Sequence, residues 1–342
     1  MIYNPFRYYS IFLSILDGRL KIFNPLALLW NILAFLVNIE RIGNKLNKNV
    51  DLVITKGLMS HIPSGIVCKK LKIPVIWHLQ DYIKVRFFGL TSHIFNYFAK
   101  TIPTKIVCDG EKIKESLGQK LFFKTKVQLN AVDRTFLKYD NKLRNQIRHE
   151  FKIPKNAYVI GHLARITSWK GQEYLLKAFI KYSKLNSNAY LLMVGSPLFD
   201  NDKYFKYLKN MIYKSNLTKK VIMPGYRDDL NKIYSSMDLF FCTSIEKDTS
   251  PLSLISGIVF GLPVAISNIE TLKEIKNICP EVKTFEPSSI KQIIDIIKKY
   301  ESPEKRIVDG RKNRKLGKKH FNILIFSKNM NKTIRSILAN SK

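Results

Sequence analysis

Short apolar runs rich in β-branched residues alternate along the chain with longer stretches of helical periodicity. Runs of this kind, separated by helices, are typical of a parallel sheet covered by helices on both faces. In the first half such runs lie at 51–55, 73–77, 105–108 and 126–129. In the second half they lie at 158–162, 189–194, 220–223, 239–242 and 263–266. The pattern therefore predicts an α/β protein built from two successive α/β units.

A polar, charged stretch at 140–155 separates the two halves and is interpreted as a linker. The length of 342 residues suits two domains of about 150 residues each better than one core. We therefore expect an N-terminal domain at 1–139 and a C-terminal domain at 140–320. An apolar-periodic helix at 321–342 is expected to follow.

The segment 22–39 has nearly the ~18 apolar residues of a membrane span. It also carries Asn24, Pro25, Asn31 and Asn38, and a buried helix of a large α/β protein gives the same pattern. A buried or interfacial helix is favoured over a span. The first residues lack a basic stretch, apolar core and cleavage site in series, so no secretory signal is expected.

The net charge of +32 comes from 58 Lys and Arg against 26 Asp and Glu. Such a surface attracts anions, including nucleic acid, lipid headgroups and phosphorylated ligands. A coding sequence rich in A and T, which favours Lys, Ile and Asn everywhere, explains the charge equally well. No RNA-stacking motif or helix-turn-helix pattern is recognisable, so nucleic acid is not expected as a partner.

The four cysteines have neither CxxC spacing nor histidines nearby. They are Cys68, Cys108, Cys242 and Cys279. Their spacing predicts neither a zinc site nor a disulfide framework, and we expect a reducing, cytoplasmic setting.

The main candidate chemistry lies in the loop after 158–162, where Arg165 and Lys170 are followed by Gly171. A loop at the carboxyl end of a parallel strand opens onto the crevice where α/β proteins bind ligands. An arginine fork and a lysine charge there suit a diphosphate, and the amides at the start of the next helix add donors. For a basic pair taken alone, a solvated loop is the alternative.

The string IGHLARITSWKGQEYLLKAF at 160–179 resembles the donor-site segment of family 4 (group 1) glycosyltransferases of the GT-B fold, of the bacterial polysaccharide type. Three further segments resemble the family in the same order, at 191–196, 221–244 and 244–267. The first half resembles it more loosely, at 51–83 and 127–137.

This resemblance implies a set of ligand contacts. The donor diphosphate is implied to bind Arg165, Lys170, Gly171, Thr249, Ser250, Leu252 and Ser253. The nucleotide is implied to bind near Gly225, Tyr226 and Ser256.

The chain departs from the family at its pair of glutamates separated by seven residues. Anchoring on Gly261 and Pro263 puts Ser256 at the second position and Asp248 at the first, with Glu246 two residues earlier. Either acid can accept two hydroxyls of the donor sugar, whereas Ser256 offers the ribose one short hydroxyl. Exposed loop acids without a function are the alternative.

His78 follows the run at 73–77, and the resemblance implies that it contacts the transferred sugar or steadies charge near the anomeric carbon. A hydrogen-bonded structural histidine is the open alternative. Asp81 is expected either to orient His78 or to begin the next helix.

The family's usual opening, a strand, glycine-rich loop, helix and second strand, is not recognisable in 1–20. We therefore expect an N-terminal domain that lacks its first βαβ unit and leaves a sheet edge exposed.

We expect two Rossmann-like domains of the GT-B fold facing each other across a cleft, with the last helix packing back on the N-terminal domain. The implied reaction is retaining transfer of a sugar from a nucleotide-sugar to an acceptor hydroxyl, without metal or cofactor. A lipid-linked glycan of surface polysaccharide assembly is the expected acceptor, and the expected location is cytoplasmic, with peripheral contact to the anionic inner membrane face. A catalytically silent relative, truncated or acting as a partner subunit, is the main alternative, and a nucleic-acid-binding protein is a further one.

Overall fold

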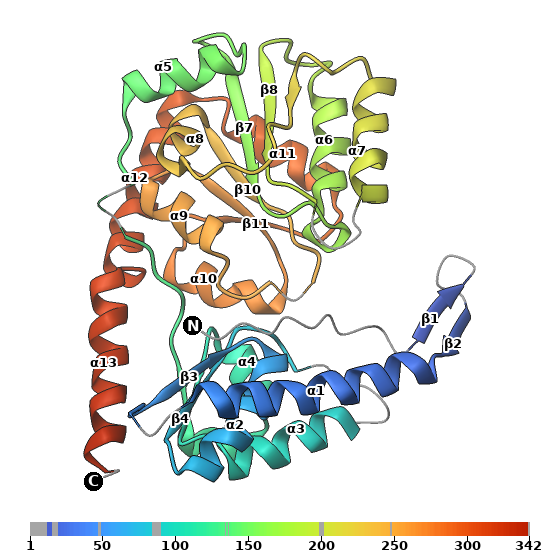
Figure 1. The fold of residues 1–342 in the computed structure, drawn as a ribbon. Coiled ribbons are helices and arrows are strands. Elements are labelled where there is room, and N and C mark those ends of the chain that lie inside the picture. Colours follow the sequence, from blue (N-terminus) through green and yellow to red (C-terminus); the bar gives the residue numbers. More distant parts are fainter. Residues whose placement is uncertain are drawn as a thin grey trace. The chain divides into compact units, whose positions relative to one another are not determined.

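The computed structural model describes residues 12–15, 20–46, 49–83, 90–133, 135, 137–197, 202–246 and 248–340. The chain divides into two compact units (Figure 1). The first unit comprises Met1–Gln128 and Met330–Lys342, and the second comprises Leu129–Asn329. Each contains a parallel β-sheet with helices packed on it, so the predicted α/β class is confirmed.

The first unit holds a four-stranded parallel sheet in the order β3-β4-β5-β6. Its strands are Val53–Lys56 (β3), Val75–Leu79 (β4), Lys105–Cys108 (β5) and Thr125–Val127 (β6). Its helices are Pro25–Lys45 (α1), Leu58–Leu71 (α2), Leu90–Thr101 (α3), Glu111–Ser116 (α4) and the 3-10 helix Gln119–Lys124. All four predicted strands are present, and their bounds differ from the predicted ones by a few residues. Short apolar runs rich in β-branched residues between helices are rarely anything but strands.

A two-stranded antiparallel sheet of Phe12–Ile15 (β1) and Leu20–Phe23 (β2) precedes helix Pro25–Lys45 (α1). The side chain of Asn24 caps α1 by accepting a hydrogen bond from the Ala27 amide. Leu26, Leu29 and Leu33 form an exposed row along the helix. Among the described helices, α1 alone has the length and composition to cross a membrane, and 22% of its most apolar window is buried. Of the two predicted alternatives, a buried helix does not hold for most of this segment, and an interfacial helix stays a prediction.

The second unit holds a six-stranded parallel sheet in the order β12-β11-β10-β7-β8-β9. Its strands are Tyr158–Leu163 (β7), Ala189–Val194 (β8), Val221–Ile222 (β9), Leu239–Cys242 (β10), Val264–Ser267 (β11) and Lys283–Phe285 (β12). Five of these were predicted, and β12 was not. The chain reverses direction across the sheet between β7 and β10, which makes the carboxyl end of β7 a topological switch point, where α/β proteins bind ligands.

Helices cover both faces of this sheet, and separate apolar clusters lie on the two faces. The helices are Asn141–Glu150 (α5), Gln172–Tyr182 (α6), Asp202–Lys214 (α7), Leu230–Ser236 (α8), Leu252–Phe260 (α9), Lys273–Ile278 (α10), Ile290–Lys299 (α11) and Pro303–His320 (α12). Two 3-10 helices lie at Ser168–Lys170 and Glu270–Leu272.

The last helix, Ile323–Ala339 (α13), begins in the second unit and ends in the first. Its residues Met330, Ile334 and Ile337 pack with Ile76 and Val107 of the first sheet.

The boundary between the units lies at Gln128 and Leu129, earlier than the predicted one at 139/140. The intervening segment packs with the second unit because Val132 pairs with Asn322 and the Asn130 amide donates to Ser250 Oγ at 2.8 Å.

The stretch 140–155, interpreted from sequence as a linker, is largely helical and forms α5. Asp140 caps α5 by accepting from the Lys142 and Leu143 amides. Ile147 and Arg148 face inward and are fully buried. The linker interpretation is wrong because the buried Arg148 donates to the carbonyls of Ser236 at the end of α8 and of Lys155, which local charge density does not reveal.

Candidate functional site

A cavity of about 530 Å³ lies at the carboxyl ends of β7 and β8 in the second unit. It is lined by Leu163, Ala164, Arg165, Val194, Gly195, Ser196, Tyr226, Arg227, Asp228, Leu230, Tyr234, Leu252, Ser253 and Ser256. Five residues predicted from sequence line it: Arg165, Tyr226, Leu252, Ser253 and Ser256. This cavity, at the switch point of the sheet, is the candidate donor pocket.

Glycines set the shape of the pocket. Gly195 has φ +141°, and a Cβ there would lie 1.9 Å from the carbonyl oxygen of Ala164. Its amide donates to the Gly225 carbonyl at 2.8 Å, which ties the loop after β9 to the end of β8. The Tyr226 amide donates to Ser196 Oγ at 2.9 Å, and the Tyr226 ring stays 76% exposed at the pocket rim.

The two predicted cations behave differently. Arg165 is exposed, lines the pocket and lies 6.0 Å from the Trp169 ring. Lys170 is buried, lies 4.4 Å from the same ring and donates to Asp248 Oδ2 at 2.5 Å. Arg165 is therefore the cation open to a ligand, while Lys170 is held in an ion pair behind it.

The two candidate acids differ in the same way. Asp248 is buried and also accepts a hydrogen bond from Ser244 Oγ, whereas Glu246 is exposed. Asp248, which occupies the family's first acidic position, is thus the partner of Lys170. A sugar contact by Asp248 would have to share its carboxylate with that lysine.

Gly171 permits the tight turn behind Lys170. It has φ +68°, and a Cβ there would lie 2.1 Å from the carbonyl oxygen of Thr243. Thr243 Oγ1 donates to the Lys170 carbonyl at 2.8 Å, which fixes this loop against the end of β10. His162 lies buried beneath it, and burial, reinforced by Lys170, lowers the pKa of its imidazole to about 3.

The start of α9 forms another wall. Ser250 has φ +40° and is held by Asn130, whose amide donates to its Oγ and whose side chain donates to its carbonyl. Leu252 and Ser253 in the first turn line the pocket, and first-turn amides have no intrahelical acceptor. This wall can bind an anion through backbone donors.

Ser256, on the next turn of α9, is 4% exposed and lines the pocket. Tyr234 donates from its hydroxyl to the Ser253 carbonyl at 2.8 Å, and burial raises the tyrosine's pKa, opposed by a hydrogen bond with Ser256. Among the described lining residues the one acid is Asp228, which sequence analysis missed. It lies two residues after Tyr226 of the Gly225–Tyr226 turn, and that position was the available signal.

His78 lies in the first unit, on β4, and is 1% exposed. Its Nε2 donates to Asp109 Oδ1 at 2.6 Å, and Gln80 Nε2 donates to Asp109 Oδ2 at 3.2 Å. Asp81, expected either to orient His78 or to begin the next helix, is exposed, and the acid bonded to His78 is Asp109. Asp109 directly follows β5, the strand paired with β4, so adjacent strand ends bring the two side chains together.

Residues 144–319 match the family model described as Glycosyl transferases group 1. An uncharacterized glycosyltransferase of Methanocaldococcus jannaschii is 28% identical over 68% of this chain and 59% of its own length. The UDP-Gal:alpha-D-GlcNAc-diphosphoundecaprenol alpha-1,3-galactosyltransferase of Escherichia coli is 25% identical over 64% of this chain and 58% of its own. The chain thus spans less than two thirds of the length of these relatives.

The fold is also that of solved glycosyltransferase structures. The crystal structure of Anabaena HepE in complex with UDP and glucose superposes with a TM-score of 0.80 at 19% identity, covering 87% of this chain and 81% of that one. Sucrose-phosphate synthase from Thermosynechococcus elongatus superposes with a TM-score of 0.73 at 16% identity, covering 92% and 79%. With a matching family model and two Rossmann-like units of the GT-B type, the chain belongs to the group 1 glycosyltransferases.

Proposed function

We propose that the protein transfers a sugar, with retention of its anomeric configuration, from a nucleotide-sugar to the hydroxyl of an acceptor. The observation that carries this proposal is the donor pocket, where Arg165 and the first turn of α9 face one cavity at the switch point of the sheet. A guanidinium and free helix amides together suit a diphosphate.

Other lining groups fit the rest of a nucleotide. The exposed ring of Tyr226 offers a surface for stacking a base. The carboxylate of Asp228 offers two acceptor oxygens for ribose hydroxyls, and Ser256 offers one hydroxyl. A nucleoside diphosphate in this pocket would therefore find partners for each of its parts.

In the proposed step, the bond between the anomeric carbon and the diphosphate breaks while the acceptor oxygen bonds to that carbon. The acceptor proton leaves with the diphosphate. Arg165 and Lys170 would stabilise the negative charge that develops on the leaving group, and Asp248 holds Lys170 in place. Glu246 or Asp248 would position the sugar, and His78, oriented by Asp109, would steady the reacting centre. No metal is part of the proposal.

The proposed acceptor is a lipid-linked glycan of surface polysaccharide assembly. The name of the Escherichia coli relative, with its diphosphoundecaprenol acceptor, supports this class. The exposed leucine row of α1 supports peripheral contact with a membrane, proposed to be the cytoplasmic face. Flotation with phosphatidylglycerol vesicles tests this contact, and wild-type protein that stays in the dense fraction contradicts it.

The experiment for the donor proposal measures binding by calorimetry and transfer across UDP-, GDP- and ADP-sugars. Arg165→Ala should weaken UDP binding by about tenfold, as expected for one charge-assisted hydrogen bond. Lys170→Ala should lower turnover by about 10²–10³-fold, the loss typical of one preorganised transition-state donor. Lys181→Ala removes an exposed lysine of the neighbouring α6 and is the matched control. Product anomers identified by NMR test retention.

No binding of any donor, or unchanged UDP binding by Arg165→Ala together with unchanged turnover by Lys170→Ala, would contradict the proposal. A catalytically silent relative is the second candidate, favoured by Ser256 at the position of the family's second glutamate. Donor binding without transfer or hydrolysis of any sugar would support that candidate instead.

A further inference from the structure

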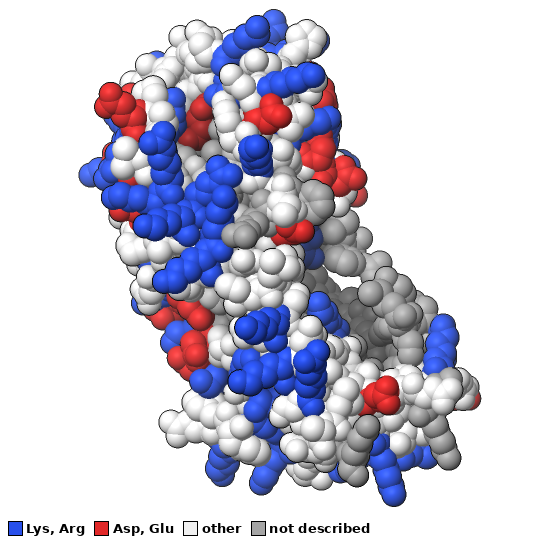
Figure 2. All heavy atoms as spheres, turned by 90° about the vertical axis from the view of Figure 1, so that its left-hand side faces the viewer, with Lys and Arg blue, Asp and Glu red and all other residues white. Residues whose placement is uncertain are grey.

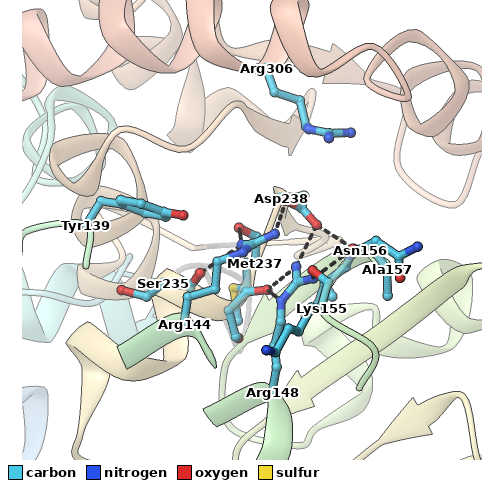
Figure 3. A network of polar contacts seen from close by, with 12 residues as sticks. Tyr139, Arg144, Arg148, Lys155, Asn156, Ala157, Ser235, Met237, Asp238 and Arg306 are labelled. Atoms are coloured by element: carbon cyan, nitrogen blue, oxygen red, sulfur yellow. Dashed lines mark hydrogen bonds and ion pairs between the residues drawn. The ribbon is translucent and has the colours of Figure 1, made fainter. Parts of the chain in front are cut away.

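A second cavity of about 530 Å³ lies at the amino ends of β10 and β11 in the second unit. It is bordered by Tyr139, by Arg144 of α5, by the loop Gly261–Pro263 and by one face of α12. Figure 3 shows Tyr139, Arg144, Asp238 and Arg306. It shares no lining residue with the donor pocket among the residues described for each. We name it the arginine pocket.

The arginine pocket takes its charge from residues far apart in the sequence. Four of its lining residues are arginines, Arg144, Arg306, Arg311 and Arg314, and one is an acid, Asp238. The three from α12 are spaced so that they share a helix face. Gly310, on the same face, lets α12 approach closely, since a Cβ there would lie 2.2 Å from the Gly261 carbonyl oxygen.

Asp238 does not neutralise this charge, because two arginines already share it. Arg144 donates to Asp238 Oδ1 at 2.7 Å, and Arg148 donates to Oδ2 at 2.8 Å. Arg148 is fully buried, and burial lowers its pKa despite the nearby carboxylate. Its other donors are used by backbone carbonyls, including that of Ser236. One positive charge therefore remains at the base of the pocket.

The arginines of α12 add to this excess. Arg306 donates to the carbonyls of Tyr300 and Glu301, and its side chain extends from α12 toward the space above Asp238 (Figure 3). Arg311 is exposed. The Nε of Arg314 is buried, and among the described residues no acceptor lies within hydrogen-bond distance of it. Figure 2 shows Lys and Arg side chains gathered on this side of the second unit.

The rest of the lining is largely apolar. Phe260, Leu262 and Ile307 contribute side chains, and the Tyr139 ring lies edge-on to Phe260 at 6.4 Å. Bare inorganic anions gain nothing from such a surface. A ligand with an apolar or aromatic group attached to its charge would use both parts of the pocket.

We propose that the arginine pocket is a binding site for a phosphate ester, with the phosphate on the guanidinium groups of α12 and an adjoining apolar group on Phe260 and Leu262. The site is separate from the donor pocket and does not depend on the proposed transfer. Soluble aryl phosphates and anionic lipid headgroups share this chemistry.

The test measures dissociation constants by calorimetry for phenyl phosphate, for monomeric dihexanoyl phosphatidic acid and for inorganic phosphate, each with saturating UDP present. Arg311→Gln/Arg314→Gln should weaken binding of the esters by at least about tenfold, as expected for loss of charge-assisted hydrogen bonds. Arg311→Gln alone is the variant for the case in which the double variant does not fold, because Arg311 is exposed. Lys203→Gln/Lys206→Gln removes equal charge from exposed positions of α7.

The proposal is supported if an ester binds the wild type and the control more tightly than inorganic phosphate, and if the arginine variants lose that binding while keeping their UDP affinity. Preference for phenyl phosphate points to a soluble ligand, and preference for the phosphatidic acid points to a lipid headgroup. Displacement of the esters by UDP, equal affinity in wild type and variants, or no binding of either ester would overturn it.

Discussion

The two ends of the six-stranded sheet differ in whether their buried basic side chains are matched by carboxylates. At the carboxyl end the buried Lys170 meets one carboxylate, Asp248, in a balanced pair. At the amino end two arginines, Arg144 and Arg148, share Asp238, and one positive charge is left over. The net charge of +32 is therefore more than a uniform compositional background, because the fold concentrates part of it beside a cavity.

The largest expected effect comes from removing the shared acid. Asp238→Ala should lower the free energy of unfolding by about 3–5 kcal/mol, since it leaves the fully buried Arg148 uncompensated. It also deprives the Val159 amide of its acceptor. Asp248→Ala should cost less, about 1–3 kcal/mol, because the side chain of Lys170 that it leaves unpaired is 11% exposed, whereas that of Arg148 is 0% exposed.

Urea denaturation measures both values, with Asp295→Ala as an exposed control on α11. If the Asp248 variant is as unstable as the Asp238 variant, the two ends do not differ as proposed. The Lys170–Asp248 pair would then contribute as much to the free energy of unfolding as the carboxylate shared by Arg144 and Arg148.

A smaller effect is expected from adding a side chain at Gly171 or Gly310, where another part of the backbone lies close to the glycine. Gly171→Ala should lower the free energy of unfolding by about 2 kcal/mol, since it adds a clash with Thr243 to a left-handed conformation. Gly310→Ala meets a similar clash with Gly261 but lies within α12, where alanine regains about 1 kcal/mol of helix propensity. Thermal unfolding of both variants compares them. If Gly310→Ala is the more damaging, tight packing at the amino end outweighs the strained turn.

The smallest expected effect is a pH dependence at the carboxyl end. Burial lowers the pKa of His162 from 6.5 to about 3, so between these values the unfolded chain binds a proton that the folded chain does not. Stability from this residue is complete above pH 6.5 and falls by about 1.4 kcal/mol per pH unit below it.

His162→Gln should reduce this slope relative to wild type in urea titrations at pH 7.5, 6.5 and 5.5. Identical slopes for the two proteins would show that His162 takes up its proton within the folded state.

The sequence predicted the α/β class, nine of the twelve strands shown in the structure and the family, because strand and helix periodicities and the glycine turns are local. It failed where a local property was misleading. The charged stretch 140–155 was interpreted as a linker although Ile147 and Arg148 make it a packed helix. For α1 it left a buried and an interfacial helix open, since apolar composition does not say what covers a helix, and the structure leaves the leucine row exposed.

Within the candidate site, the sequence placed Arg165 and the start of α9 at one pocket through the order of the motifs. It did not show that Asp248 is buried and bound to Lys170 while Glu246 is exposed, and it did not find Asp109 as the hydrogen-bond partner of His78. Such pairs join side chains far apart in the sequence, and only folding brings them within hydrogen-bond distance. The arginine pocket has the same origin, since Arg144 and the three arginines of α12 come to line one cavity only after the sheet has brought their helices together.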